Sequence, residues 1–381
     1  MKYIKVSKKK ESIANIGSNK AFDFKLFFSV MVLLCIGLVM VASASSYYAL
    51  TEFNNSSHFL VRQLVFAIIG VIVMLVISKV NYRIYSKFAY IIYGFVLLLM
   101  ILVLIPGIGT EVNGARRWID LKVTTFQPSE LMKIALILAL STYIVNNYKK
   151  LTSIPRYILP SVFFILVCIV MFFQNHLSGM IVMAFITGII FLASGMKLEA
   201  KYIIPIILIG ALAVGGFLFA KGFRMDRITS FLNPEDDITG SNWQASQSLY
   251  AIGSGGLFGR GLGQSRQKYL WLPEAQNDFI FSVTAEELGF VGSTVIICIF
   301  GYFIIRGIRT ALKCKDLFGM LIATGITSMF AFQIIVNIAV VTKSMPVTGM
   351  PLPFFSYGGT SLLINLAAVG ILLNISRHTA K

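Results

Sequence analysis

The chain has 381 residues, of which 57% are hydrophobic and only 13% are charged. So few polar side chains cannot cover a water-facing surface, and the composition therefore excludes a soluble globular protein. The formal net charge of +17 would suit a nucleic-acid-binding protein, but the basic residues are spread over short loops and one N-terminal tail. Attraction to membrane lipids with anionic headgroups explains that distribution, and no nucleic acid is expected as a partner.

Ten apolar runs approach or reach the length of about 17 to 25 residues that an α-helix needs to cross a bilayer. They predict an all-α, polytopic integral membrane protein with about ten transmembrane helices. The predicted spans are residues 26–46, 63–79, 88–105, 127–145, 158–174, 180–195, 202–220, 279–305, 317–341 and 359–376. A basic tail of residues 1–25 precedes this membrane domain of residues 26–376, and residues 377–381 follow it.

Lysine and arginine predict the orientation of the spans. With the N-terminus in the cytoplasm, the cytoplasmic tail and loops hold most of the 33 basic residues, as the positive-inside rule requires. Both termini are then cytoplasmic, in a multi-pass membrane protein. A signal peptide cleaved after Ala42-Ser43-Ala44 is disfavoured, because the polar start is long and nine spans follow.

Two predicted outer connections are much longer than the others. The first covers residues 106–126, and the second is a large extracytoplasmic loop, residues 221–278, between helices seven and eight. Connections of this length in a compact protein are usually functional or disordered. The second contains several aromatic residues, and the period of residues 243–252 predicts an amphipathic helix on the outer membrane surface.

These outer segments are rich in basic residues, which suggests an anionic partner. Arginine is suited to one, because its planar fork binds phosphate oxygens two at a time. The alternative is that long loops cross the membrane whatever their charge. The glycine-rich stretch 253–263 resembles phosphate-binding loops only weakly, and a tightly turning loop is the better interpretation.

The fourth span opens with Gln127-Pro128-Ser129-Glu130. Proline suits the first helical position, and a glutamate in the first turn offsets the helix dipole. Lys133 lies one turn further, at the i, i+3 spacing that allows it to pair with Glu130. Two interpretations remain open: Lys133 snorkels from a capping region, or the pair lines a polar cavity.

Three carboxylates mark the start of the eighth span. Asp278 is the last charge before an apolar run, whereas Glu286 and Glu287 lie inside that run, with Glu286 about 12 Å deeper by helical rise. Helical geometry predicts that the two glutamates face different directions. Structural pairing is therefore expected for them, and only Asp278 is a candidate for chemistry.

The remaining polar features are less specific. The three histidines, His58, His176 and His378, share no helical spacing with a carboxylate, so no protein metal site is predicted. His176 lies in an outer turn, where a polar connector is the simplest interpretation. The last outer loop, residues 345–360, is rich in proline and glycine, and such irregular backbone is predicted to line a cavity or pack on protein.

Three blocks of this sequence, in order, resemble the SEDS family (shape, elongation, division and sporulation), most closely its FtsW-like and SpoVE-like members. The blocks are Gly114-Ala115-Arg116-Arg117-Trp118-Ile119 leading into residues 127–133, residues 272–281 with 286–289, and Pro351-Leu352-Pro353-Phe354-Phe355-Ser356-Tyr357-Gly358-Gly359. The resemblance runs from the first span to the C-terminus. One departure is that Gln174 is followed by Asn175 and His176, where many members have Pro-Asp.

The resemblance implies ten transmembrane helices in the bacterial cell membrane and a peptidoglycan glycosyltransferase that polymerises lipid II, an undecaprenyl-diphosphate-linked disaccharide-pentapeptide. It implies a class B penicillin-binding protein as transpeptidase partner, together with other divisome or sporulation cell-wall proteins. The family's essential aspartate falls on Asp278. The residues expected to shape the substrate site are Arg116, Arg117, Trp118, Glu130, Lys133, Ser356 and Tyr357.

The implied chemistry fits these residue types. A carboxylate can take the proton of the attacking hydroxyl, and cations can stabilise the diphosphate leaving group. Direct displacement inverts the anomeric centre and needs no covalent intermediate. No cofactor is certain, although Asp278 and the diphosphate together could hold Mg or Mn. A lipid II flippase is the alternative, disfavoured because the intramembrane charges cluster in the outer half. Division, spore cortex and elongation roles all stay open.

Overall fold

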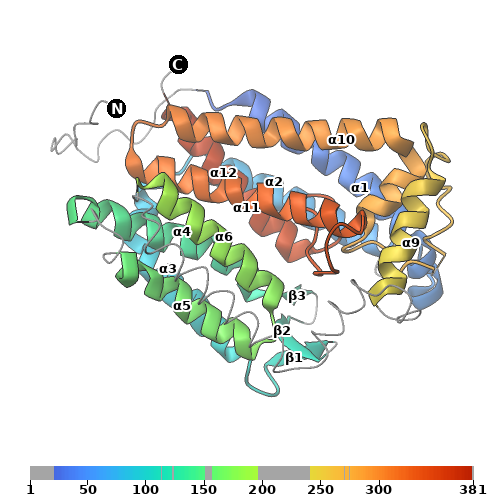
Figure 1. The fold of residues 1–381 in the computed structure, drawn as a ribbon, viewed down its shortest axis with the longest axis horizontal. Helices are drawn as coiled ribbons and strands as arrows, with labels where there is room; N and C mark the ends of the chain where they lie inside the picture. Colours follow the sequence, from blue (N-terminus) through green and yellow to red (C-terminus); the bar gives the residue numbers. More distant parts are fainter. Residues whose placement is uncertain are drawn as a thin grey trace.

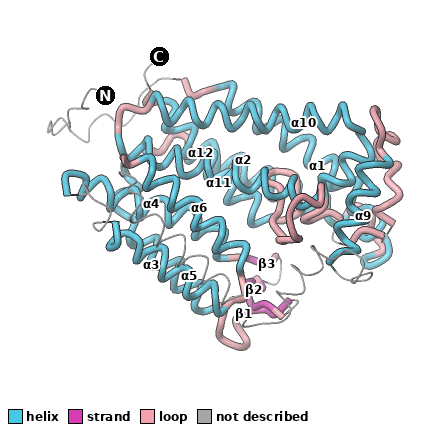
Figure 2. The backbone as a smooth tube through the Cα atoms, viewed as in Figure 1, coloured by secondary structure: helices cyan, strands magenta, loops and turns pink. Residues whose placement is uncertain are grey.

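The computed structural model describes residues 21–112, 114–121, 124–150, 157–195, 241–269, 271–273 and 275–379. Long helices dominate this part of the chain, and a small sheet lies at one end of the bundle (Figure 1, Figure 2). The helices are α1 (Phe24–Phe53), α2 (His58–Ile77), α3 (Tyr85–Leu102), α4 (Pro128–Asn147), α5 (Ile158–Phe173), α6 (Leu177–Ala193), α9 (Ser241–Ser254), α10 (Ile280–Lys313), α11 (Leu317–Val341) and α12 (Gly359–Arg377). Two short 3₁₀ turns, η1 (Tyr82–Ile84) and η2 (Tyr148–Lys150), lie beside α3 and α4.

The helices confirm a polytopic membrane protein. Nine of the ten predicted spans coincide with helices among the described residues, and seven of these helices are long and apolar enough to cross a membrane. The other two, α5 and α6, are shorter apolar helices. The predicted span at residues 202–220 lies outside the described part of the chain. Helix α10 continues to Lys313, about two turns past the predicted end at residue 305.

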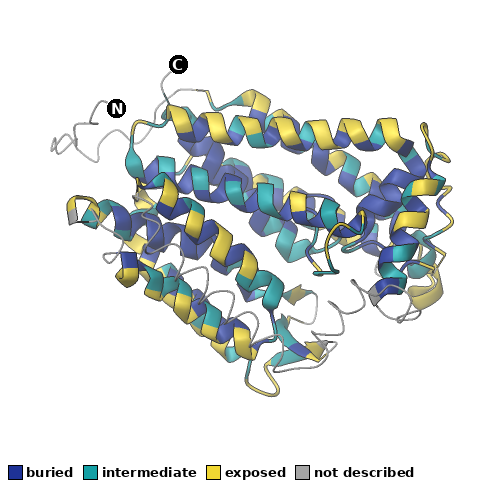
Figure 3. Cartoon of the chain, viewed as in Figure 1, coloured by how far each residue is buried: buried dark blue, intermediate teal, exposed yellow. Residues whose placement is uncertain are grey.

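Burial separates an inner helix from lipid-facing ones. Helix α4 contacts α3, α5, α6 and α11. Of an apolar stretch of 18 residues in α4, 83% is buried inside the protein, against 22% for the equivalent stretch of α2. Large aliphatic side chains of α2 and α3, such as Ile72 and Ile91, are exposed instead. Figure 3 shows that the outward faces of the bundle are exposed, and these aliphatic side chains make them apolar, which is the arrangement expected for helices solvated by lipid.

The outer connection at residues 106–126 contains a three-stranded antiparallel sheet, which the all-α prediction lacked. Its strands, in spatial order, are β1 (Gly109–Val112), β2 (Ala115–Asp120) and β3 (Thr125–Phe126). A tight turn through Gly114, whose φ is +72°, joins the first two strands. The hydroxyl of Thr360, in α12, donates to the carbonyl of Thr125 at 3.0 Å, so the sheet is fixed to the helical bundle.

The helix predicted at residues 243–252 is confirmed as α9, which packs against α10 and α11. Ser248 anchors it. Its Oγ lies 2.6 Å from the Oγ of Ser282 in α10 and donates to the carbonyl of Val341 at the end of α11, also at 2.6 Å. Hydrogen bonds from one buried hydroxyl therefore join three helices at the outer end.

Helix α10 is broken at Gly289, whose φ of 69° and ψ of −171° are not helical. The glycine-rich loop after α9 lies against this break and replaces the missing helical hydrogen bonds. Its N–H groups donate to carbonyls before the break, and N–H groups after the break donate to its carbonyls. The four bonds are Arg260 to Glu286 (3.0 Å), Gly261 to Glu287 (3.0 Å), Phe290 to Gly256 (2.9 Å) and Val291 to Leu257 (3.0 Å).

Glycine is required where the loop and the broken helix meet. A Cβ at Gly255 would lie 2.2 Å from the carbonyl oxygen of Ala285, and one at Gly259 would lie 2.1 Å from that of Glu287. Real Cβ atoms do not approach backbone so closely, so only glycine allows the contact. The prediction of a tightly turning loop is confirmed, and the role of the glycines is close approach of backbone to backbone.

The two glutamates before the break are buried and paired, as predicted. Arg260 lies 3.7 Å from Glu286, and Lys268 lies 3.5 Å from Glu287. Their ion-pair partners differ, but both carboxylates also accept from Ser265: its Oγ donates to Glu286 at 2.5 Å and its N–H to Glu287 at 3.3 Å. The loop wraps around the end of the helix, so side chains about 100° apart both reach it.

The start of α1 and the end of α12 lie together at the other end of the bundle. Asp23 caps α1 by accepting from the N–H of Lys25 at 3.1 Å, and its own N–H donates to the hydroxyl of Ser376 at 3.0 Å. Its carboxylate also accepts from Nε of Arg306, in α10, at 2.9 Å. Both ends of the membrane domain are therefore on the same side.

We predict that Gly289→Ala destabilises the protein. An alanine would be held at φ 69°, with its Cβ 2.2 Å from the backbone nitrogen of Gly259. The strain and clash should lower the free energy of unfolding by about 2 kcal/mol or more. Thermal unfolding in detergent measures the change.

Gly301→Ala is the matched control, since it lies in the same helix and a Cβ there meets nothing within 4 Å. Replacing a helical glycine by alanine should be neutral or stabilising by up to about 1 kcal/mol. Equal melting temperatures for the two variants would contradict the assigned role of the break.

Candidate active site

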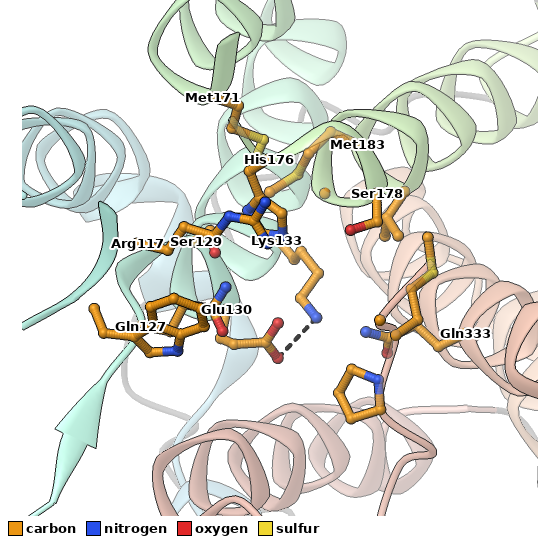
Figure 4. A pocket seen from close by; sticks show the side chains of 16 residues that line it. Arg117, Gln127, Ser129, Glu130, Lys133, Met171, His176, Ser178, Met183 and Gln333 are labelled. Atoms are coloured by element: carbon orange, nitrogen blue, oxygen red, sulfur yellow. Dashed lines mark hydrogen bonds and ion pairs between the residues drawn. The ribbon is translucent and has the colours of Figure 1, made fainter. Parts of the chain in front are cut away.

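A polar cavity lies between α4, the α5–α6 turn, α6, α11, strand β2 and the last outer loop (Figure 4). It measures about 70 Å³, room for a handful of water molecules. Its walls combine charged, polar and thioether side chains. The lining residues are Arg117, Trp118, Gln127, Ser129, Glu130, Lys133, Met171, His176, Ser178, Gly179, Val182, Met183, Gln333, Gly349, Met350 and Pro351.

The first turn of α4 supplies the ion pair of this cavity. The helix begins at Pro128 after Gln127, as the sequence predicts, so Glu130 and Lys133 fall on one face. Lys133 Nζ lies 2.8 Å from Glu130 Oε2, and their side chains are only 4% and 11% exposed. Of the two interpretations left open by the sequence, the structure favours the lined cavity over snorkelling to an interface.

Helix α12 completes the surroundings of this pair. The hydroxyl of Ser361 donates to the same Oε2 of Glu130 at 3.0 Å. A buried ion pair is maintained only when further hydrogen bonds satisfy its charged atoms, because desolvation of the two charges is costly. Glu130 therefore holds Lys133 in place, and the lysine ammonium lies near the centre of the lining side chains in Figure 4.

Strand β2 places one of the two predicted arginines at the cavity. Arg117 donates to the carbonyl of Gln174 at 3.4 Å and to that of Asn175, and its guanidinium lies 5.9 Å from the ring centre of Trp118. Arg117 and Trp118 both line the cavity. These hydrogen bonds to the turn after α5 hold the guanidinium at the cavity, which residues of α4 also line.

Arg116 is not part of the cavity. The residues that line the cavity include Arg117 but not Arg116. Arg116 instead pairs with Glu111 of β1 at 2.9 Å, with 38% of its side chain exposed. The structure therefore separates two residues that the sequence analysis grouped.

His176, at the start of α6, is a cavity residue that the sequence analysis treated as a connector. It is only 8% exposed. A Cβ at Gly179 would lie 2.7 Å from its ring, so glycine at 179 is what allows the ring to lie there. Burial lowers the pKa of His176 well below its usual value, and the charges of Arg117 and Lys133 lower it further. The side chain is therefore neutral at pH 7.

Asp278 lies just before α10, on a segment whose backbone is fixed at three successive carbonyls. Tyr357 N–H donates to the carbonyl of Gln276 at 2.9 Å, and Ser356 Oγ to that of Asn277 at 2.6 Å. Nδ2 of Asn337, in α11, donates to the carbonyl of Asp278 at 2.8 Å. Ser356 and Tyr357 therefore position this segment and do not line the cavity.

The carboxylate of Asp278 lies against the loop that forms one cavity wall. Asp278 is half-buried, and a Cβ at Gly349 would be 3.3 Å from its Oδ2. Gly349 and Met350 both line the cavity, and Asn337 also donates to the carbonyl of Met350 at 2.8 Å. The backbone at Gly349 and Met350 thus lies between Asp278 and the cavity.

Gln333 was missed by the sequence analysis. It is 3% exposed in α11 and lies across the cavity from Ser129 in Figure 4. The available signal was its spacing of four residues from Asn337, which puts two amides on one face of an otherwise apolar span. No group of three or more histidine, cysteine or acidic residues in the described ranges is placed to hold a metal ion.

Comparison with known proteins agrees with this architecture. The family model for FtsW, RodA and SpoVE, described as cell cycle protein, matches residues 24–381. Stage V sporulation protein E of Bacillus subtilis is 45% identical over 366 residues, covering 94% of this chain and 97% of that protein. The probable peptidoglycan glycosyltransferase FtsW of Trichlorobacter lovleyi is 42% identical over 356 residues, with 93% of each chain covered.

Two solved structures share the fold. A chain from a structure on polymerization and crosslinking by a peptidoglycan synthase complex superposes with a TM-score of 0.78 at 30% identity, covering 95% of this chain and 99% of that one. The rod shape determining protein RodA of Thermus thermophilus gives a TM-score of 0.70 at 30% identity, covering 95% and 98%. The chain therefore belongs to the FtsW, RodA and SpoVE family of membrane proteins.

Proposed function

We propose that this protein is a peptidoglycan glycosyltransferase that polymerises lipid II at the outer face of the cell membrane. The relatives named peptidoglycan glycosyltransferase support this activity, as does similarity to a chain of a peptidoglycan synthase complex. The observation that carries the proposal is the position of Asp278, a carboxylate beside a cavity that contains Arg117 and Lys133.

Asp278 acts as the general base. The acceptor hydroxyl loses its proton to the carboxylate as its oxygen attacks the anomeric carbon of the donor, and the bond from that carbon to the diphosphate breaks. This single displacement inverts the anomeric centre. The three hydrogen bonds to the carbonyls of residues 276–278 fix the backbone of the base, which favours a reactive geometry.

Arg117 and Lys133 stabilise the leaving group. Charge accumulates on the diphosphate as the glycosidic bond breaks, and cations in a partly dry cavity stabilise it more strongly than in water. Glu130 keeps Lys133 in place at 2.8 Å. A divalent ion held by Asp278 and the diphosphate oxygens stays a prediction.

Substrate entry requires the cavity to widen. Its 70 Å³ could admit a single small polar group, but not a disaccharide with its diphosphate. The last outer loop, through Gly349 and Met350, is the wall that also contacts Asp278. Movement of this loop would enlarge the cavity and open it toward the carboxylate of Asp278.

The protein works with a class B penicillin-binding protein that cross-links the new glycan. Support comes from the synthase complex, whose description joins polymerization with crosslinking. Both termini are cytoplasmic, since the two ends of the membrane domain lie on the same side and the positive-inside rule places them there. Other divisome or sporulation cell-wall proteins are proposed as further partners.

We predict that Asp278→Asn lowers the rate of glycan polymerisation from lipid II by about 100-fold or more, the usual contribution of a general base. Asparagine keeps the size and the backbone contacts of the segment, so folding should be unchanged. Gel separation of glycan strands made by the purified protein with its transpeptidase partner measures the rate.

Glu52→Gln is the control for this experiment, because Glu52 is an exposed carboxylate at the end of α1. Its polymerisation rate should equal that of the unsubstituted protein. If Asp278→Asn also polymerised at that rate, another group would have to act as the base.

We also predict that the adjacent arginines differ in effect. Arg117→Lys should reduce kcat/KM for lipid II by about tenfold, because lysine cannot reproduce the planar fork at the cavity. Arg116→Lys should stay within about twofold, since an exposed ion pair contributes little. Losses of similar size in both variants would show that the cavity does not bind the diphosphate.

A further inference from the structure

Three buried polar atoms that have no hydrogen-bond partner among the described residues belong to side chains that line the same cavity. They are Oγ of Ser129, Nδ1 of His176 and Oε1 of Gln333. All three residues are more than nine-tenths buried. An unsatisfied buried polar atom costs about 1–3 kcal/mol, so three at one place indicate a site that is completed by a bound group.

The three residues come from separate parts of the chain. Ser129 is in the first turn of α4, His176 precedes α6, and Gln333 is in the middle of α11. The His176 ring is held against Gly179, where any larger residue would clash with it. Convergence of three elements on one space is typical of a binding site and does not arise from local sequence.

The chemistry of these residues matches a neutral ligand group. A serine hydroxyl, a neutral imidazole and a carboxamide each supply both a donor and an acceptor. An anion would use only the donors and leave the acceptors unsatisfied. The cations that suit an anion, Arg117 and Lys133, lie beside this set in the same cavity.

Part of the wall is apolar. Met171, Val182 and Met183 line the cavity from α5 and α6. A group that fills this space can therefore combine a carbonyl and an N–H with a methyl. An acetamido group has one acceptor, one donor and one methyl, and its size is compatible with a cavity of about 70 Å³.

We propose that Ser129, His176 and Gln333 bind the acetamido group of the amino sugar that is bonded to the diphosphate. This inference rests on the proposed glycosyltransferase function. The acetamido group is attached to the carbon next to the anomeric carbon, so diphosphate bound by Arg117 and Lys133 would bring it to the neighbouring wall. The three residues then determine specificity for an N-acetylated donor.

The test compares two substrates: lipid II, and an analogue with a hydroxyl in place of that acetamido group. A hydroxyl analogue is neutral, so the cations of the cavity do not affect the comparison. The unsubstituted protein should prefer lipid II in kcat/KM by about 100-fold or more, because a site built for hydrogen bonds rejects a ligand that lacks them. The ratio between substrates is independent of the fraction of each variant that folds.

Gln333→Met, which keeps the side-chain size, and His176→Leu should each reduce this preference by about tenfold. His176→Asn, which retains a donor and an acceptor near the Nδ1 position, should keep more of it than His176→Leu. Thr327→Val is the matched control. Thr327 is another buried residue of α11 whose hydroxyl has no partner in the described part of the chain, and it does not line the cavity. The substrate preference of this variant should therefore equal that of the unsubstituted protein.

The outcomes separate this inference from the proposed function. An unsubstituted protein that polymerises lipid II and its analogue equally well overturns the inference and leaves the function standing. Unchanged preference in both Gln333→Met and His176→Leu also overturns it, as does an equal loss in Thr327→Val. A protein that polymerises neither substrate, with its partner present, overturns the function itself.

Discussion

The outer half of the molecule depends on how the break in α10 is closed. A helix interrupted at Gly289 leaves carbonyls before the break and N–H groups after it without partners, and lipid supplies none. The loop from Gly255 to Gly261 provides both kinds of partner from its own backbone. Because the contacts are backbone to backbone, they fix the position of this loop, and with it the path of the chain toward Asp278.

Buried charge strengthens the same closure. Glu286 and Glu287 would be costly at this depth, yet Arg260, Lys268 and Ser265 supply them with ion pairs and hydrogen bonds. The hydroxyl of Ser43, in α1, also donates to Glu287 at 2.5 Å. The loop after α9, helix α1 and helix α10 are thereby joined at one point, so these acids stabilise the frame of the site.

Sequence alone predicted the features that have a strong local signal. The apolar length of the spans, the Gln127-Pro128 start of α4 and the Glu130–Lys133 spacing were all sufficient, because each depends on helical geometry. The sheet in residues 106–126 was not predicted, since its strands are short and alternate weakly. Without it, nothing showed that Arg116 would pair with Glu111 of the neighbouring strand while Arg117 lines the cavity.

Contacts between distant segments were beyond sequence analysis for a different reason. The partners of Glu286 and Glu287 depend on a loop about twenty residues earlier wrapping around a helix end, and helical spacing cannot show this. Gln333 is one amide in an apolar span, and only the packing of α11 against α4 and α6 brings it to the cavity. Four of the predicted site residues line that cavity: Arg117, Trp118, Glu130 and Lys133. Ser356 and Tyr357 instead donate hydrogen bonds to the backbone just before Asp278.

The two cavity cations and Asp278 lie on separate supports. Strand β2 and α4 carry the cations, whereas α10 and α11 fix the segment with Asp278. The last outer loop lines the cavity, and at Gly349 it also lies against the carboxylate of Asp278. Its other end is rigid, because Phe354 and Phe355 are buried, and the carbonyl of Phe354 approaches α1 so closely that residue 37 must be glycine. The loop is therefore fixed at one end and lies between the cavity and Asp278 at the other, so movement there would open the cavity toward this carboxylate and leave the helices in place.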